Sequence, residues 1–124
     1  LVLTVLLSCL VQLAASCAAT SPATTPAPTL CQSCAQNLIT ITMAGGGAHE
    51  FQSDMTSTTG ACNVRTFVCT GPNANIEINN GDGVIADGDD GAVDATANLQ
   101  VTCNAAGTAW EAAGVAITQV ECSS

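Results

Sequence analysis

The chain has 124 residues, which suffices for one domain of ordinary size but not for two. It contains one Lys or Arg against ten Asp and Glu, so its formal net charge is −9. Nucleic acid and acidic lipid surfaces would be repelled by this charge, and neither is expected as a partner.

The first 16 residues, LVLTVLLSCLVQLAAS, form an apolar segment without a charged side chain. One interpretation is a secretory signal peptide, because small residues suited to cleavage after Ser16 or Ala18 follow the apolar run. The other is a retained strand, since a period of two places only Leu, Val and Cys on the face from Leu1 to Leu13. The letters LAAS before Cys17 also match a bacterial lipobox, in which Cys17 would be a lipid anchor.

Residues 17–30, CAATSPATTPAPTL, are predicted to be a linker between this segment and the folded domain. Their prolines disfavour a helix and favour an extended, polyproline-like conformation. The mixture of Thr, Ser and Pro is typical of O-glycosylated stalks, although a bare flexible tether fits it equally well. The candidate O-glycosylation sites are Thr20, Ser21, Thr24, Thr25 and Thr29.

Residues 31–124 are predicted to be one all-β domain, because alternating or β-branched apolar runs are separated by Gly, Asn and Asp turns. The predicted strands are 38–43, 62–70, 75–79, 98–103, 108–112 and 115–122. This pattern favours an antiparallel, immunoglobulin-like β-sandwich of about seven strands, preceded by an extended N-terminal segment.

Eight cysteines behind an apolar leader indicate a disulfide framework and an oxidising, extracellular compartment. The core has no Tyr, two Phe and one Trp, so bridges that each stabilise by about 2–4 kcal/mol are expected to supplement its packing. Cys9 and Cys17 lie before the domain and are candidates for intersubunit bonds. The domain itself contains six cysteines: Cys31, Cys34, Cys62, Cys69, Cys103 and Cys122.

The order of these cysteines within CQSC, GACNVRTFVC, LQVTCN, a Trp and VECSS resembles the six-cysteine extracellular domain of nematode proteins. The resemblance covers about residues 31–124 and opposes the lipobox interpretation. It implies an extracellular location and no enzymatic activity. In that family some copies lack the first and third cysteines together, which implies a Cys31–Cys62 bond here. The other four cysteines allow three pairings, of which Cys69–Cys103 and Cys34–Cys122 are the ones we expect.

Few residues suggest chemistry. Cys31 and Cys34 are interpreted as disulfide cysteines, because neither a βαβ context for redox catalysis nor a second close pair for zinc accompanies them. His49 lies near Ser53 and Asp54, but no strained nucleophile turn marks a catalytic triad, and an exposed loop histidine is expected. Calcium is a weak alternative to a solvated acidic loop, and its candidate ligands are Asp82, Asp87, Asp89 and Asp90.

The sequence therefore predicts a secreted structural protein, with no enzymatic activity and no cofactor. Residues 1–16 would be donated to a neighbouring subunit, which builds an extracellular head-to-tail filament. The alternative is a soluble monomeric binding or adhesion module with a cleaved leader, whose partner is an extracellular protein or a glycan. Neither hypothesis requires a membrane span in the mature form.

Overall fold

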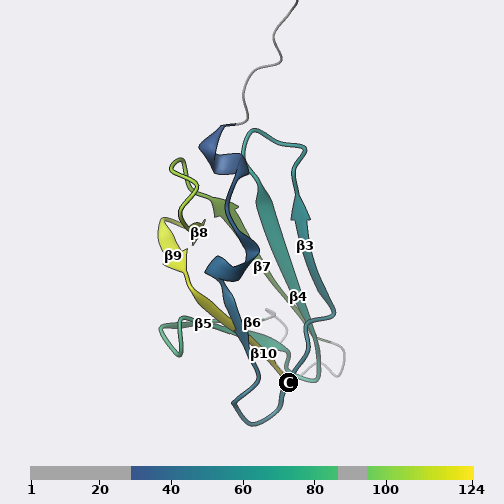
Figure 1. Cartoon of the computed structure of the whole chain (residues 1–124). Coiled ribbons are helices and arrows are strands. Elements are labelled where there is room, and N and C mark those ends of the chain that lie inside the picture. The colour runs from purple at the N-terminus through teal and green to yellow at the C-terminus, as the bar shows by residue number, and fades with distance from the viewer. Residues whose placement is uncertain (1–28, 87–94) are drawn as a thin grey trace, which may run out of the picture.

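The structure is a computed structural model that describes residues 29–86 and 95–124, and these residues form two packed β-sheets (Figure 1). Two short 3-10 helices, η1 (Leu30–Gln32) and η2 (Gln36–Leu38), precede the strands. The predicted all-β sandwich is confirmed. The described part of the chain has ten strands rather than about seven, because several are only two to four residues long.

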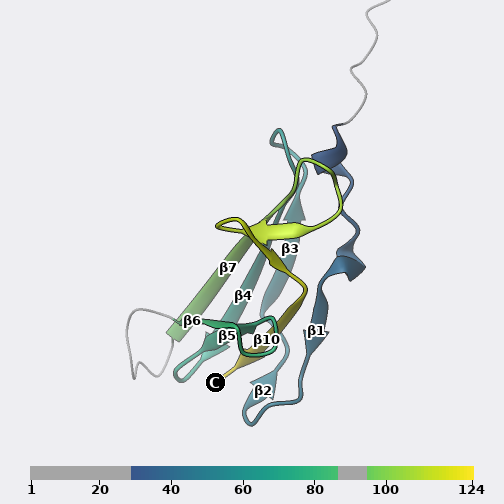
Figure 2. The ribbon, with the colours of Figure 1, turned by 90° about the vertical axis from the view of Figure 1, so that its left-hand side faces the viewer.

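The first sheet has the strand order β1-β10-β5-β6, and β2 also pairs with β10. β1 and β10 pair in parallel, whereas the other strand pairs of this sheet are antiparallel. Figures 1 and 2 show β5 and β6 running across the lower end of the sandwich. The strands of this sheet are β1 (Thr40–Thr42), β2 (Ala48–His49), β5 (Asn75–Ile78), β6 (Gly83–Ala86) and β10 (Gln119–Ser123).

The second sheet is antiparallel, with the order β3-β4-β7-β8-β9. Its last strand is followed after Thr118 by β10 of the first sheet, so the chain changes sheets at this residue. The predicted strand 115–122 is therefore divided between the two sheets. The strands of the second sheet are β3 (Ser53–Ser57), β4 (Val64–Gly71), β7 (Ala95–Cys103), β8 (Trp110–Ala112) and β9 (Val115–Ile117).

The core lies between the sheets and follows the period of two expected of strands. Every second residue of β7 is buried from Ala95 to Cys103, and β4 alternates in the same way. Trp110 and Phe67 are the largest fully buried side chains of the described residues. Small alanines on the inner face of β7 let the sheets approach closely, which explains how so few aromatic residues fill the core.

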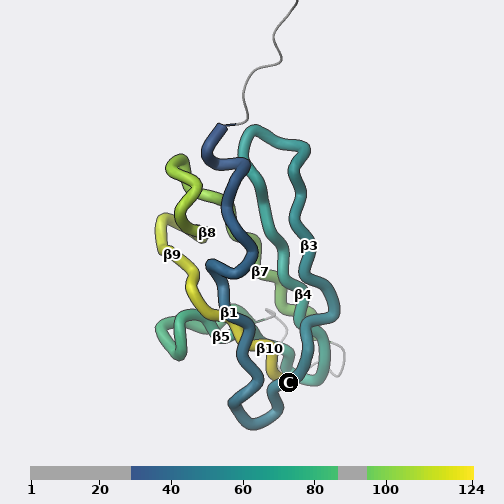
Figure 3. The backbone as a smooth tube through the Cα atoms, viewed as in Figure 1, coloured from purple at the N-terminus to yellow at the C-terminus, as the bar shows by residue number. Residues whose placement is uncertain are grey.

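Three disulfides link distant parts of this fold. Cys31–Cys62 is the bond that the family resemblance implied. Cys34–Cys103 fastens the segment between η1 and η2 to the end of β7, and Cys69–Cys122 joins β4 to β10 across the two sheets. The tube in Figure 3 shows the described chain beginning at one end of the molecule, whereas its C-terminus lies at the opposite end.

The expected Cys69–Cys103 and Cys34–Cys122 bonds are wrong. Cys69 pairs in register with Ala97 of β7, so Cys103 lies six residues further along that strand, about 20 Å away. Disulfides require Cα atoms within about 7 Å. Cys34 is bonded to Cys103 and Cys122 is bonded to Cys69, so these two cysteines also lie at opposite ends of β7.

Candidate functional site

A groove of about 420 Å³ lies between β1 and β3, the terminal strands of their sheets on this side of the sandwich. We call it the β1–β3 groove. Because β1 and β3 do not pair with each other, the two sheets are not joined by hydrogen bonds along this side of the sandwich. The groove is lined by Ile41, Met43, Glu50, Phe51 and Asp54.

The groove exposes apolar side chains that a closed sandwich would cover. Ile39, Ile41 and Met43 share one face of the extended segment, as the sequence alternation predicted. Ile39 is only 4% exposed, but Ile41 is 43% and Met43 is 59% exposed. The apolar face of β1 is therefore buried at its start and open to solvent toward its end.

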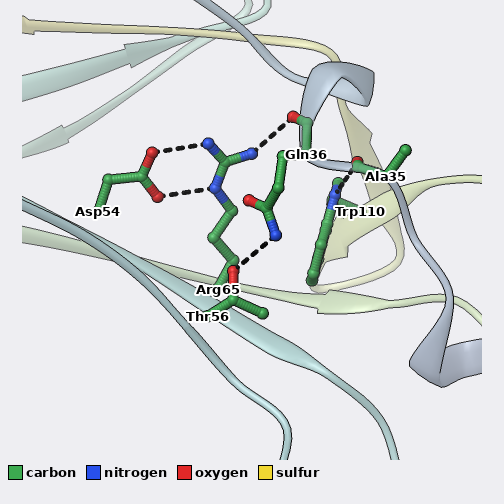
Figure 4. A network of polar contacts seen from close by, with 6 residues as sticks. All are labelled: Ala35, Gln36, Asp54, Thr56, Arg65 and Trp110. Atoms are coloured by element: carbon green, nitrogen blue, oxygen red, sulfur yellow. Dashed lines mark hydrogen bonds and ion pairs between the residues drawn. The ribbon is translucent and has the colours of Figure 1, made fainter.

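Arg65 of β4 forms a polar network beside this groove (Figure 4). Its Nε and Nη2 groups donate to the two carboxylate oxygens of Asp54, at 2.7 and 2.6 Å. Its Nη1 group donates to the main-chain oxygen of Gln36 at 2.8 Å. The guanidinium also lies 4.6 Å from the ring centroid of Phe67, within range of a cation–π interaction. A buried charge is thus paired and hydrogen-bonded, as its burial requires.

The segment around η2 is held over the second sheet by further side-chain bonds (Figure 4). The amide of Gln36 donates to Thr56 Oγ1 at 2.9 Å, and Trp110 Nε1 donates to the main-chain oxygen of Ala35 at 2.9 Å. These contacts fix the start of β1 relative to β3, and so they fix the two sides of the groove.

Few charged groups lie at the groove. Arg65 is the one Lys or Arg in the chain. Its bidentate pair with Asp54 offsets that carboxylate. Glu50 remains as an exposed anion at the rim. The surface of the groove is therefore apolar, with the exposed carboxyl group of Glu50 at its rim.

A second pocket, of about 480 Å³, lies on the outer side of the first sheet and is acidic. Glu121 of β10 and Glu77 of β5 are directly opposite each other in the strand register. The pocket is lined by Thr42, Ala44, Gly45, Glu77, Asn80, Gln119 and Glu121.

Glu121 is held in this pocket by main-chain donors. The N–H groups of Ala44 and Gly45 donate to its two carboxylate oxygens at 2.7 and 3.0 Å. The bond from Ala44 is the main cause that lowers the pKa of Glu121 below its usual 4.5, with smaller contributions from Thr42 and Gly45, while desolvation opposes the shift. A side chain at position 45 would displace this carboxylate from its present place, and glycine avoids that contact.

The expectation of an exposed loop histidine is wrong, because His49 lies in β2, is half-buried and contacts Sγ of the disulfide-bonded Cys122 at 3.5 Å. Its Nδ1 atom contacts the main-chain oxygen of Glu50 at 2.9 Å, and its Nε2 atom contacts Ser124 Oγ at 3.0 Å. The partner of Nδ1 is thus a main-chain carbonyl and not the carboxylate that a Ser-His-Asp triad needs. Asp54 is bonded to Arg65 instead.

Of the remaining predicted site residues, Thr29 and Asp82 lie within the described part of the chain. Thr29 is exposed, and its hydroxyl donates to the main-chain oxygen of Ala61 at 3.3 Å. Asp82 is exposed in the turn before β6. The other candidates lie outside the described residues: Cys9, Cys17, Thr20, Ser21, Thr24, Thr25, Asp87, Asp89 and Asp90.

Sequence reasoning did not identify either pocket. The acidic pocket had one signal, the AGGG run at 44–47, because glycine lets a main chain approach a carboxylate closely. The β1–β3 groove had no signal in the sequence, because its position depends on which strands form the edges of the two sheets.

A family model for the C6 domain matches residues 34–122. No curated protein and no solved structure matches the chain. Within residues 29–86 and 95–124, no helix has the length and apolar character to cross a bilayer. The C6 family is not a known enzyme family, and three disulfides fit an extracellular protein. The chain therefore belongs to the C6 domain family, as the spacing of its cysteines predicted.

Proposed function

We propose that this chain is a secreted, non-enzymatic structural protein that assembles into extracellular filaments. Each subunit would donate its apolar residues 1–16 as an added strand to the sandwich of the next subunit. The observation that supports this most is the open side of the sandwich, where an edge strand and exposed apolar side chains lie together. An unpaired edge of this kind is a template for pairing with another chain.

The linker is long enough for exchange between subunits. Residues 17–29, if extended at about 3.1 Å per residue, span roughly 40 Å. A head-to-tail contact in which one surface meets a different surface of the next copy does not close, and it therefore produces an open filament. Three intrachain disulfides would keep each subunit folded outside the cell.

Deletion of residues 1–16 tests this proposal. We expect the 124-residue chain to form filaments visible by negative-stain electron microscopy and to elute as large species in size-exclusion chromatography. The chain lacking residues 1–16 should elute as a monomer at the same concentration. A 124-residue chain that stays monomeric over a wide concentration range would contradict the proposal.

The second candidate is a monomeric extracellular binding module whose leader is cleaved. The small residues that follow the apolar run, suited to a cleavage site, favour it. In that case the same open side of the sandwich would receive a strand from another protein.

A further inference from the structure

We infer that the acceptor of the donated strand is the free edge of β1 together with the β1–β3 groove, and that residues 1–13 of a second copy occupy it. This inference rests on the proposed function. It adds the surface that accepts the donated strand and the face of residues 1–13 that contacts this surface. The occupant is a segment of this same chain that lies outside the described residues.

The main chain of β1 is available on its outer side. Thr40 N–H donates to Thr118 O at 2.9 Å, and β1 pairs with β10 through residues 40–42. Neighbouring residues of a strand direct their main-chain groups to opposite edges, so the N–H and C=O of Ile41 point away from β10. Among the described strands none pairs with this edge. An incoming strand can therefore bond to Ile41.

The side chains beside this edge fit an apolar strand. Ile41, Met43 and Phe51 line the groove, and Phe51 packs on the buried Phe67 with ring centroids 5.1 Å apart. A strand added to β1 presents every second side chain to the groove. Residues 1–13 offer such a face, made only of Leu, Val and Cys.

The charges favour an uncharged occupant. Asp54 is already bonded to Arg65, so it does not need a cation from a partner. An acidic strand would be repelled by Glu50 at the rim and by the net charge of −9. Residues 1–16 contain no charged side chain, and they would leave Glu50 in water at the edge of the contact.

A matched pair of substitutions in the full chain tests the acceptor. Met43→Glu places a carboxylate in the groove, where an added strand would bury it without a partner. Val84→Glu is the control, because Val84 is also 59% exposed and lies on β6, the other edge of the same sheet. We expect Met43→Glu to raise the concentration needed for filament formation at least tenfold in a sedimentation assay. Val84→Glu should change it less than twofold.

Hydrogen exchange of the unsubstituted chain supplies a second readout that does not depend on a variant folding. The amide of Ile41 should exchange at least tenfold more slowly in assembled protein than in protein diluted to monomer. Unchanged exchange at Ile41 in filaments would overturn the inference.

The two proposals fail in different ways. Filaments that form equally well with Met43→Glu would reject the groove as acceptor while leaving self-association intact. Monomers in which residues 1–16 are protected from exchange, and are released by Met43→Glu, would retain the groove but reject the filament, because the segment would then occupy its own subunit.

Discussion

Arg65 shows how one residue determines the local structure of an acidic chain. As the one Lys or Arg present, it pairs with Asp54, reaches the main chain of Gln36 and covers the ring of Phe67. From the sequence, Arg65 is visible only as a positive charge, because a period-two pattern reveals neither its burial nor its partner.

The pair of Arg65 with Asp54 should contribute to folding. We expect Asp54→Asn to lower the free energy of unfolding by about 1–3 kcal/mol, since hydrogen bonds to a charged group are replaced and Arg65 stays 5% exposed without its counter-ion. Urea denaturation measures this loss. Asp82→Asn, at an exposed carboxylate, is the control, and an equal effect of both substitutions would show that the pair contributes nothing.

Glu121 should make the fold sensitive to acid. Its pKa is lower in the folded protein than the usual 4.5, so its ionised form adds stability above about pH 4.5, and this stability is lost as the pH falls through the folded pKa. We expect the melting temperature of Glu121→Gln to be lower than that of the parent at pH 7, and the difference to shrink as the pH falls below 4.5. A constant difference across this range would contradict the role of its ionised form.

At the scale of elements, the sequence predicted strands where apolar and polar residues alternate strictly. β5 and β7 were predicted this way and β4 was predicted from a β-branched run, although β7 begins at Ala95, three residues before the predicted strand 98–103. β3 was missed because Met55 is its one large apolar residue, and at the edge of a sheet little apolar burial is required. β2 and β6 are too short to show a period.

The disulfide pairing depended on information that the sequence does not contain. Cys69 and Cys103 are both buried, but they lie on neighbouring strands of the same sheet, whereas the expected bond would cross from one sheet to the other. Their separation follows from the register of β4 with β7, and register is set by packing of whole strands. Only Cys31–Cys62 was inferred correctly, through the family resemblance.

The three disulfides should differ in their accessibility to a reductant. Cys69 and Cys122 are both fully buried, whereas Cys62 is partly exposed. Under a mild phosphine reductant without denaturant, we expect Cys31–Cys62 to open first and Cys69–Cys122 last. Alkylation followed by peptide mapping gives the order, and early labelling of Cys122 would contradict the burial seen here.

At the scale of the whole molecule, the sandwich is closed by disulfides at its ends and left open along one side. The core is small because its aromatic residues are few, and the covalent bonds between sheets and segments supplement it. All six cysteines of residues 31–124 are used within the chain. Among the eight cysteines of the sequence, this leaves Cys9 and Cys17 as the candidates for covalent bonds between subunits.

This restriction predicts how a filament would be cross-linked. In a head-to-tail assembly, exchange with added oxidised glutathione, which is reduced to two thiols, would join Cys9 of one chain to Cys17 of the next. A non-reducing gel should then show a ladder, and either Cys9→Ser or Cys17→Ser should remove it. Dimers that persist in each single variant would indicate bonds between like cysteines and contradict a head-to-tail arrangement.

The intact mass of the secreted protein tests the central claim most directly. A donated strand requires that residues 1–16 remain in the mature chain, so the mass of protein recovered from filaments should include them, together with three intrachain disulfides. A secreted protein that begins at Cys17 or Ala19 and stays monomeric would contradict the account.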